Sequence, residues 1–237
     1  MLGLAATKPA RITVMTTTMP HWTDAQTTAH HSIGNAVAVV DNLLSFAKDG
    51  RGKPSEKERA LFAAAVVFTY GIWENFVEEL AIEIASEVSK EIDPEKVPEQ
   101  IKKIFEKRTA WELTVTPGWR ALWVDYVRVK AVGDDENRFG MNTAKAGQVE
   151  NLLRLAGIVD PYERIEVGLI PSHLPSEKNT VVKAINTLVE LRGEIVHTGA
   201  VPDDLRKKHV VDWRKFVEVA TTKMDEVCRM RSKALLS

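Results

Sequence analysis

Cysteine is almost absent: the 237 residues contain one, Cys228. A single cysteine excludes an intramolecular disulfide and any zinc site built from several cysteines. Histidines do not replace them, because His30 and His31 have no partner histidine at helical spacing and no cysteine nearby. We therefore expect no metal ion and no cofactor, and the low cysteine content is typical of a reducing cytoplasm.

An excess of one charge sign is also missing. Lysine and arginine total 32, aspartate and glutamate total 33, and the formal net charge is −1. Such a balance provides no general attraction for nucleic acid, so contact with RNA would require a local basic patch.

Long apolar runs and export signals are lacking too. The longest uncharged apolar run, Ala60 to Trp73, is shorter than the roughly 20 residues that cross a bilayer. Met1 to Thr18 lacks the basic start, apolar stretch and cleavage site of a secretory signal. We expect a soluble cytoplasmic protein with no membrane partner.

Strand signals are the last absence. No segment alternates apolar and polar residues between turn signals, and no long repeat is visible. Phosphate-binding loops, Gly-rich dinucleotide turns and serine nucleophile elbows do not occur. The expected fold class is all-α, a bundle of about six to eight helices. Residues 25–237 should form a single domain, and residues 1–24 an N-terminal tail or loosely docked arm.

Helical periodicity and capping signals are what the sequence does contain. They predict helices at residues 24–48, 55–89, 93–113, from 116 onward, 143–156, a short one at 160, 180–197 and 203–235. The longest should begin with a capping box of Ser55 and Glu58. Its predicted core stripe consists of Phe62, Val66, Thr69, Trp73, Phe76, Leu80 and Ile84. Residues 63–67 are apolar all round, so we expect them to be deeply buried.

The most informative segment runs from Leu191 to Gly199, where Arg192 and His197 lie near the end of an apolar helix. A histidine can move protons near neutral pH, and a guanidinium can hold a phosphate and spread its developing charge. Arg192 falls within the apolar arc of an ideal helix, whereas His197 lies about 140° away. Two arrangements could bring them together: unwinding near Gly193 to Gly199, or two copies packed with these segments facing. We favour the second, with some contribution from the first. The alternative is a histidine that only satisfies carbonyls at a helix end.

Residues 188–199 resemble the signature of the HEPN superfamily (higher eukaryotes and prokaryotes nucleotide-binding), in which an apolar helix carries Arg, four to six residues, then His. Residues 70–77 and 142–158 are similar to segments of stand-alone bacterial members such as the RiboL-PSP-type group. The resemblance implies an all-α homodimer that cleaves RNA without metal, with Arg192 and His197 as the catalytic pair. It also implies a role in toxin–antitoxin or phage-defence systems. Active members often have Asn, Asp or His after the arginine, where this chain has Gly193, and Glu194 could substitute only partly.

Further residues could support this site. Glu74 is the first charge after a long apolar stretch, so it could pair with Arg192 and fix its rotamer. The alternative is a solvated glutamate beside Glu78 and Glu79. A basic cluster follows the motif and could contact the RNA backbone, although such runs are often only solvated faces. It consists of Arg206, Lys207 and Lys208.

The function expected from these residues is a metal-independent endoribonuclease with a composite Arg-x4-His site at a homodimer interface, acting as a toxin or phage-defence effector. RNA is the expected substrate, and an antitoxin or regulatory protein is an expected partner. The alternative is an inactive dimer of the same architecture that binds RNA, a nucleotide or a protein partner.

Overall fold

A computed structural model describes residues 21–49, 52–115, 118–134, 140–165, 170–175 and 180–237. In these ranges all regular structure is helical and no strand occurs. Eight α-helices of five residues or more are present, with one additional single-turn helix and two 3₁₀ segments. The prediction of an all-α bundle of six to eight helices is confirmed.

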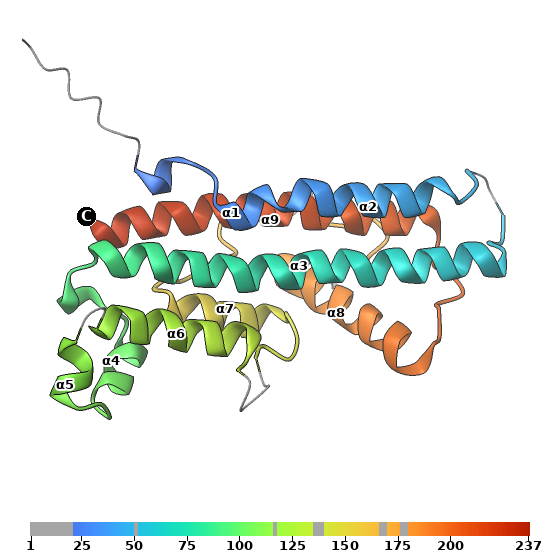
Figure 1. The fold of residues 1–237 in the computed structure, drawn as a ribbon. Coiled ribbons are helices and arrows are strands. Elements are labelled where there is room, and N and C mark those ends of the chain that lie inside the picture. Colours follow the sequence, from blue (N-terminus) through green and yellow to red (C-terminus); the bar gives the residue numbers. More distant parts are fainter. Residues whose placement is uncertain (1–20, 50–51, 116–117, 135–139, 166–169, 176–179) are drawn as a thin grey trace, which may run out of the picture.

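Helix α3 (Glu56–Glu91) is the central element of the bundle (Figure 1). Helices α2 (Ile33–Ser45) and α9 (Lys207–Leu236) lie along one side of it, and α6 (Gly118–Val132), α7 (Ala146–Leu155) and α8 (Val181–Thr198) along the other. By length and composition alone, α3 is the one helix of the described ranges that could span a membrane. Here it is the core helix, because α1, α2, α6, α7, α8 and α9 all contact it.

The start and the core stripe of α3 follow the sequence prediction. The Ser55 hydroxyl accepts a hydrogen bond from the Glu58 N–H, and the Glu58 carboxylate accepts one from the Ser55 N–H, which completes the capping box. Every residue of the predicted stripe is buried. An apolar stripe at helical spacing therefore identified the packed face of this helix.

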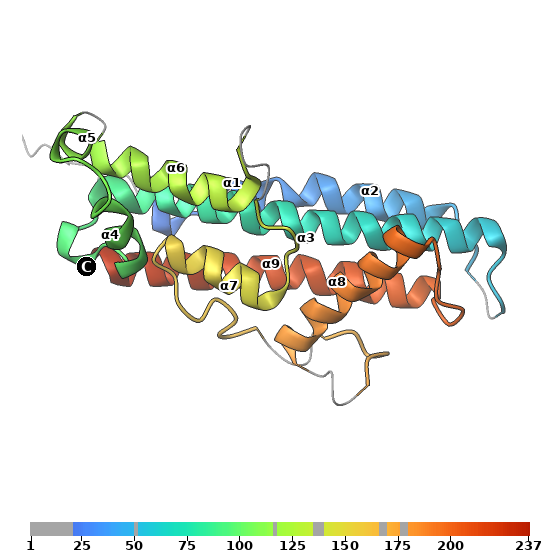
Figure 2. The same ribbon diagram turned by 90° about the horizontal axis from the view of Figure 1, so that it is seen from below.

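The prediction that residues 63–67 are buried all round is wrong. Ala64 is exposed, Ala63 and Val67 are only half-buried, and Phe68 just beyond is 41% exposed. The reason is that α8 crosses α3 obliquely (Figure 2), so that it covers only part of this side of α3. An apolar strip of the central helix consequently remains open.

Two predicted helices are broken into shorter ones. The predicted helix at residues 24–48 is replaced by α1 (Thr28–His31) and α2, which follow a 3₁₀ turn (Trp22–Asp24), because Thr27 caps a new helix with its side chain. Residues 93–113 contain a 3₁₀ turn (Pro94–Lys96), α4 (Glu99–Phe105) and α5 (Ala110–Thr114). Here Pro98 and a second capping box, Thr109 with Glu112, restart the helix.

Other predicted boundaries shift by a few residues. Helix α7 begins at Ala146 rather than 143 and is closed by Gly157 at φ 89°. Residues 161–164 form turns rather than the predicted short helix, and α9 begins at Lys207 rather than 203. The predicted helix start at 116–117 lies outside the described residues, and α6 follows from Gly118.

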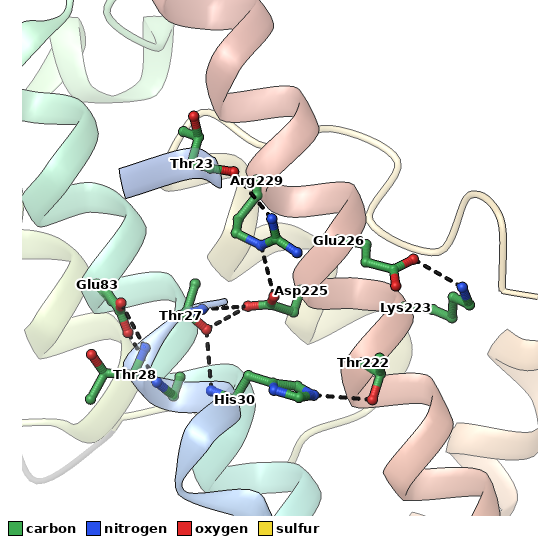
Figure 3. Close-up of polar contacts among 11 residues, drawn as sticks. Thr23, Thr27, Thr28, His30, Glu83, Thr222, Lys223, Asp225, Glu226 and Arg229 are labelled. Carbon is green, nitrogen blue, oxygen red and sulfur yellow. Dashed lines mark hydrogen bonds and ion pairs between the residues drawn. The ribbon is translucent and has the colours of Figure 1, made fainter. Parts of the chain in front are cut away.

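A polar network joins the beginning of the described chain to α3 and α9 (Figure 3). The Glu83 carboxylate of α3 accepts hydrogen bonds from the N–H groups of Thr28 and Ala29, which cap α1. Buried Asp225 of α9 accepts from the Thr27 N–H at 3.2 Å and the Thr27 hydroxyl at 2.5 Å. Arg229 donates to Asp225 at 2.8 Å and to the Thr23 carbonyl at 3.1 Å.

This network places residues 21–24 against α9, with Thr23 buried. The part of the predicted arm that the structure describes is therefore docked rather than loose. Residues 1–20 lie outside the described residues.

Candidate functional site

Helix α8 carries the Arg192–His197 segment. Thr180 caps its start by accepting a hydrogen bond from the Lys183 N–H at 3.2 Å. Its end is set by Gly199, which adopts φ 68° and donates its N–H to the Ile195 carbonyl at 3.0 Å. The helix is continuous through Gly193 to Thr198, so the predicted unwinding near Gly193–Gly199 is wrong. The chain therefore leaves the helical conformation only at Gly199, the residue that follows the helix.

Arg192 lies on the side of α8 that faces the central helix. Its guanidinium carbon lies 5.0 Å from the centroid of the Tyr70 ring of α3, within the range of a cation–π contact. The Nε atom is buried without a hydrogen-bond partner. The two terminal nitrogens have no hydrogen-bond or ion-pair partner in the described part of the chain, and they are not sealed from solvent. Arg192 thus contacts an aromatic ring and keeps the donors of its two terminal nitrogens free for an anion.

Tyr70 is fixed by polar contacts of its own. Its hydroxyl donates to Glu74 Oε1 at 2.5 Å and accepts from the Ala144 N–H at 3.0 Å. Trp73 donates its indole N–H to the Ala144 carbonyl at 2.9 Å. The segment before α7 is therefore bound to α3 directly beside Arg192.

Glu74 has a different role from either of the two that the sequence indicated. No ion pair joins it to Arg192 among the described residues, so the predicted direct pairing is wrong. The alternative of a solvated glutamate is wrong as well, because Glu74 is half-buried and accepts the Tyr70 hydroxyl. It positions the ring that supports Arg192.

Burial changes the acidity of two groups on this face of α3. Burial, followed by the hydrogen bond to Glu74, raises the pKa of Tyr70, which keeps its hydroxyl neutral and able to donate. Burial, followed by the charges of Glu74 and Glu79, raises the pKa of Glu78 to about 7. Sequence reasoning missed Tyr70 and Glu78 as site residues. Their spacing from Glu74, four residues in each direction, was the signal, because it places all three on one helix face.

His197 occupies another side of α8. Its side chain is exposed, and its Cδ2 lies 4.0 Å from the point where a Cβ on Gly193 would be. Glu194 is also exposed. Because the helix is regular between the two motif residues, about 140° separates Arg192 from His197. One copy of the chain does not bring the guanidinium and the imidazole together.

The predicted basic cluster lies at the start of α9, at the end of the bundle where α2 connects to α3 (Figure 1). The ammonium of Lys207 donates to Asp49 at 2.6 Å and to the Ala47 carbonyl at 2.9 Å. Arg206 donates to the Asp203 and Leu205 carbonyls. Two of the three cations therefore have contacts within the fold, and Lys208 is exposed.

An apolar groove of about 650 Å³ adjoins the last turns of α8. Helices α2, α3 and α8 form its walls, and it includes the open strip of α3 with Phe68. Val196, the neighbour of His197, lines the groove and is 48% exposed. This surface can bind an apolar partner next to the motif.

Within the described ranges, no three His, Cys, Asp or Glu side chains are grouped so that they could hold a metal ion. His30 instead shares a hydrogen bond of 3.0 Å with the Thr222 hydroxyl.

Comparison with known proteins gave no match among family models, curated proteins or solved structures.

Proposed function

We propose that the protein is a metal-independent endoribonuclease that acts as a homodimer, with Arg192 and His197 of both subunits lining one RNA-binding cleft. The observation that carries the proposal is the state of Arg192, a half-buried cation over Tyr70 without an acidic partner among the described residues. Placing a charge in an apolar arc is costly unless it meets an anion. A phosphodiester is an anion that a guanidinium can bind through two parallel hydrogen bonds.

The geometry of α8 supports the proposed homodimer. Since one continuous helix separates the two side chains by about 140°, we assign the missing group to a second α8. A two-fold axis places a surface opposite its own copy. The apolar groove that includes Phe68 and Val196 is the surface we assign to that second copy.

The proposed reaction is transesterification at an RNA phosphate. His197 acts as the base that takes the proton of the 2′-hydroxyl, or as the acid that protonates the leaving 5′-oxygen. The 2′-oxygen bonds to phosphorus while the bond to the 5′-oxygen breaks, which yields a 2′,3′-cyclic phosphate and a 5′-hydroxyl. Arg192 stabilises the charge on the non-bridging oxygens. The reaction needs the 2′-hydroxyl, so DNA should not be cut.

The direct test is incubation of total RNA with the purified protein in EDTA. Wild type should produce fragments with 2′,3′-cyclic phosphate ends, and Arg192→Ala and His197→Ala should each lower cleavage at least about a hundredfold. Arg128→Ala and His31→Ala are matched controls, because both side chains are exposed and lie outside the motif. Equal cleavage by wild type and His197→Ala would refute the mechanism.

A subunit-mixing experiment tests the shared cleft. Co-expression of the Arg192→Ala and His197→Ala chains gives dimers in which an intact arginine and an intact histidine come from different subunits. Cleavage should return in the mixed sample although each variant alone is inactive. If the mixture stays inactive while it dimerises, the two subunits do not share a site.

The second candidate is an inactive dimer that binds RNA, a nucleotide or a protein partner. Gly193 favours it, because this residue leaves no polar side chain next to Arg192. Retained RNA binding without fragments in EDTA would support this candidate. In either case the resemblance of residues 188–199 to HEPN proteins favours a cytoplasmic toxin or phage-defence role, with an antitoxin or regulatory protein as partner.

A further inference from the structure

A basic cavity of about 670 Å³ lies between the start of α3, with the described residues before it, and the start of α9. Figures 1 and 2 show that these two helix starts lie at the end of the bundle away from the C-terminus. Two acidic residues, Asp49 and Glu58, line it. The cations of its lining are Lys48, Lys53, Arg206, Lys207 and Lys208. Cations exceed acids by three in this cavity, whereas the whole chain has a net charge of −1.

Both carboxylates of the cavity are already engaged. Asp49 accepts a hydrogen bond from the Lys207 ammonium at 2.6 Å. Glu58 accepts from the Ser55 N–H at 2.8 Å, and the hydrogen bonds from Ser55 lower the pKa of Glu58. Lys48, Lys53 and Lys208 form no ion pair within 4 Å in the part of the chain described, although the charge of Lys48 helps to lower the pKa of Glu58. Positive charge therefore remains uncompensated around the cavity.

The three cations contributed by α9 lie where the helix itself is positive. Arg206 is the N-cap and provides no side-chain cap, and the first turn contains no acidic residue. The first helical hydrogen bond runs from the Val210 N–H to the Arg206 carbonyl at 3.2 Å. Cations at this end of the helix are repelled by its partial positive charge and by one another. A bound anion would reduce both of these repulsions.

The remaining wall of the cavity is apolar. The cavity is also larger than a bare anion would fill. Phe62, Val211 and Pro54 line it, and its volume is within the usual range for small-molecule sites. We propose that this basic cavity binds a phosphate monoester. The phosphate contacts the lysines and the first turn of α9, and the organic part lies against Phe62 and Val211. The ester is either a free small molecule or the 5′-phosphate of an RNA.

The first test is calorimetric titration of the full chain with inorganic phosphate and with pyrophosphate at low salt. We expect saturable binding that Lys208→Gln and Lys53→Gln each weaken about tenfold, because each removes a charge-assisted contact. Lys103→Gln is the matched control, since Lys103 is exposed on α4 outside the cavity. Absence of binding to wild type, or equal weakening by the control, would overturn the proposal.

A stability measurement separates ligand binding from a structural role of the lysine. Without phosphate, Lys208→Gln should melt at the wild-type temperature or above it, because a charge that opposes the dipole has been removed. Pyrophosphate should raise the melting temperature of wild type and of Lys103→Gln but not that of Lys208→Gln. An equal rise in all three proteins would contradict the assignment.

A further binding measurement distinguishes an RNA end from a free small molecule as the source of the phosphate. It compares the affinity of the His197→Ala chain, which should not cleave RNA, for two oligoribonucleotides of the same sequence, one with a 5′-phosphate and one with a 5′-hydroxyl. A Lys208-dependent preference for the phosphorylated strand identifies an RNA end. Equal binding of the strands, together with pyrophosphate binding, identifies a small molecule. Cleavage in EDTA is measured separately, so failure here leaves the nuclease proposal standing.

Discussion

At the scale of single residues, Tyr70 organises the surroundings of Arg192. Its ring lies under the guanidinium, and its hydroxyl links Glu74 to the backbone of Ala144. An arginine held by a ring keeps its donors available, whereas a carboxylate partner would occupy them. The ring and the hydroxyl can be separated by mutation.

Tyr70→Phe keeps the ring and removes the hydroxyl. We expect the free energy of unfolding to fall by about 1–2 kcal/mol, because the buried Ala144 N–H and Glu74 lose their partner. Urea unfolding measures the change. Tyr126→Phe is the control, since its hydroxyl has no hydrogen bond among the described residues, and it should change stability little. A loss of similar size in the control would contradict the assigned role.

Glu78 should make stability depend on pH. Its pKa is raised to about 7 in the folded state from an ordinary value of 4.5, so between these values the folded protein holds a proton that the unfolded chain has lost. The native state is therefore favoured at low pH, and this advantage disappears as pH rises through about 7.

The corresponding test is Glu78→Gln, which removes the burial of charge. It should stabilise the protein by about 1–2 kcal/mol at pH 8 and by much less at pH 5, allowing for partial contact with solvent. Unfolding in urea at both pH values measures this. Glu106→Gln, an exposed change elsewhere, should show no such difference. An equal effect of Glu78→Gln at both pH values would refute the assignment.

At the scale of elements, helix ends decide how the chain is divided. Capping boxes at Ser55 and Thr109 start helices, and Gly199 in the left-handed region ends α8. The buried Asp225 acts across elements, because it joins Thr27 before α1 to Arg229 on α9 (Figure 3). It therefore anchors the first part of the bundle to the last helix.

Replacing Asp225 by alanine should lower the free energy of unfolding by about 3 kcal/mol, because buried Thr27 and half-buried Arg229 lose their acceptor. The neighbouring Glu226→Ala removes only an exposed ion pair with Lys223 and should cost under about 0.5 kcal/mol. Chemical denaturation compares the two. Hydrogen exchange should also become faster in α1 for Asp225→Ala alone, and equal exchange in both variants would contradict the anchoring role.

At the scale of the whole molecule, one side of the central helix is left uncovered. Helix α8 crosses α3 obliquely (Figure 2). The apolar groove lined by Phe68 and Val196 stays open next to the end of α8. Exposed apolar surface of this kind is typical of an interface. The site proposed here is complete only if a second copy covers it.

Charge introduced into this groove should prevent association. Phe68→Glu and Val196→Glu should shift the protein from dimer to monomer in analytical ultracentrifugation, because desolvating an unpaired carboxylate in an interface is unfavourable. Val132→Glu is the control, since Val132 is 54% exposed on α6 and does not line the groove. A dimer that persists in both groove variants would place the interface elsewhere.

The sequence alone determined the fold class, the central helix and its buried stripe. These depend on local spacing: apolar residues at helical intervals and capping residues such as Ser55 and Glu58 act within a few positions of one another. The same local pattern drew attention to Arg192 and His197, and it gave their angular separation on α8 correctly because that helix is regular.

Only the tertiary structure decided which groups these residues contact. The ring of Tyr70 lies under Arg192, Glu74 reaches the site through that ring, and Phe68 stays open, because the oblique crossing of α8 over α3 sets all three. The crossing depends on contacts between segments more than a hundred residues apart. Spacing along the chain contains no information about such contacts, whereas packing of side chains in three dimensions fixes them.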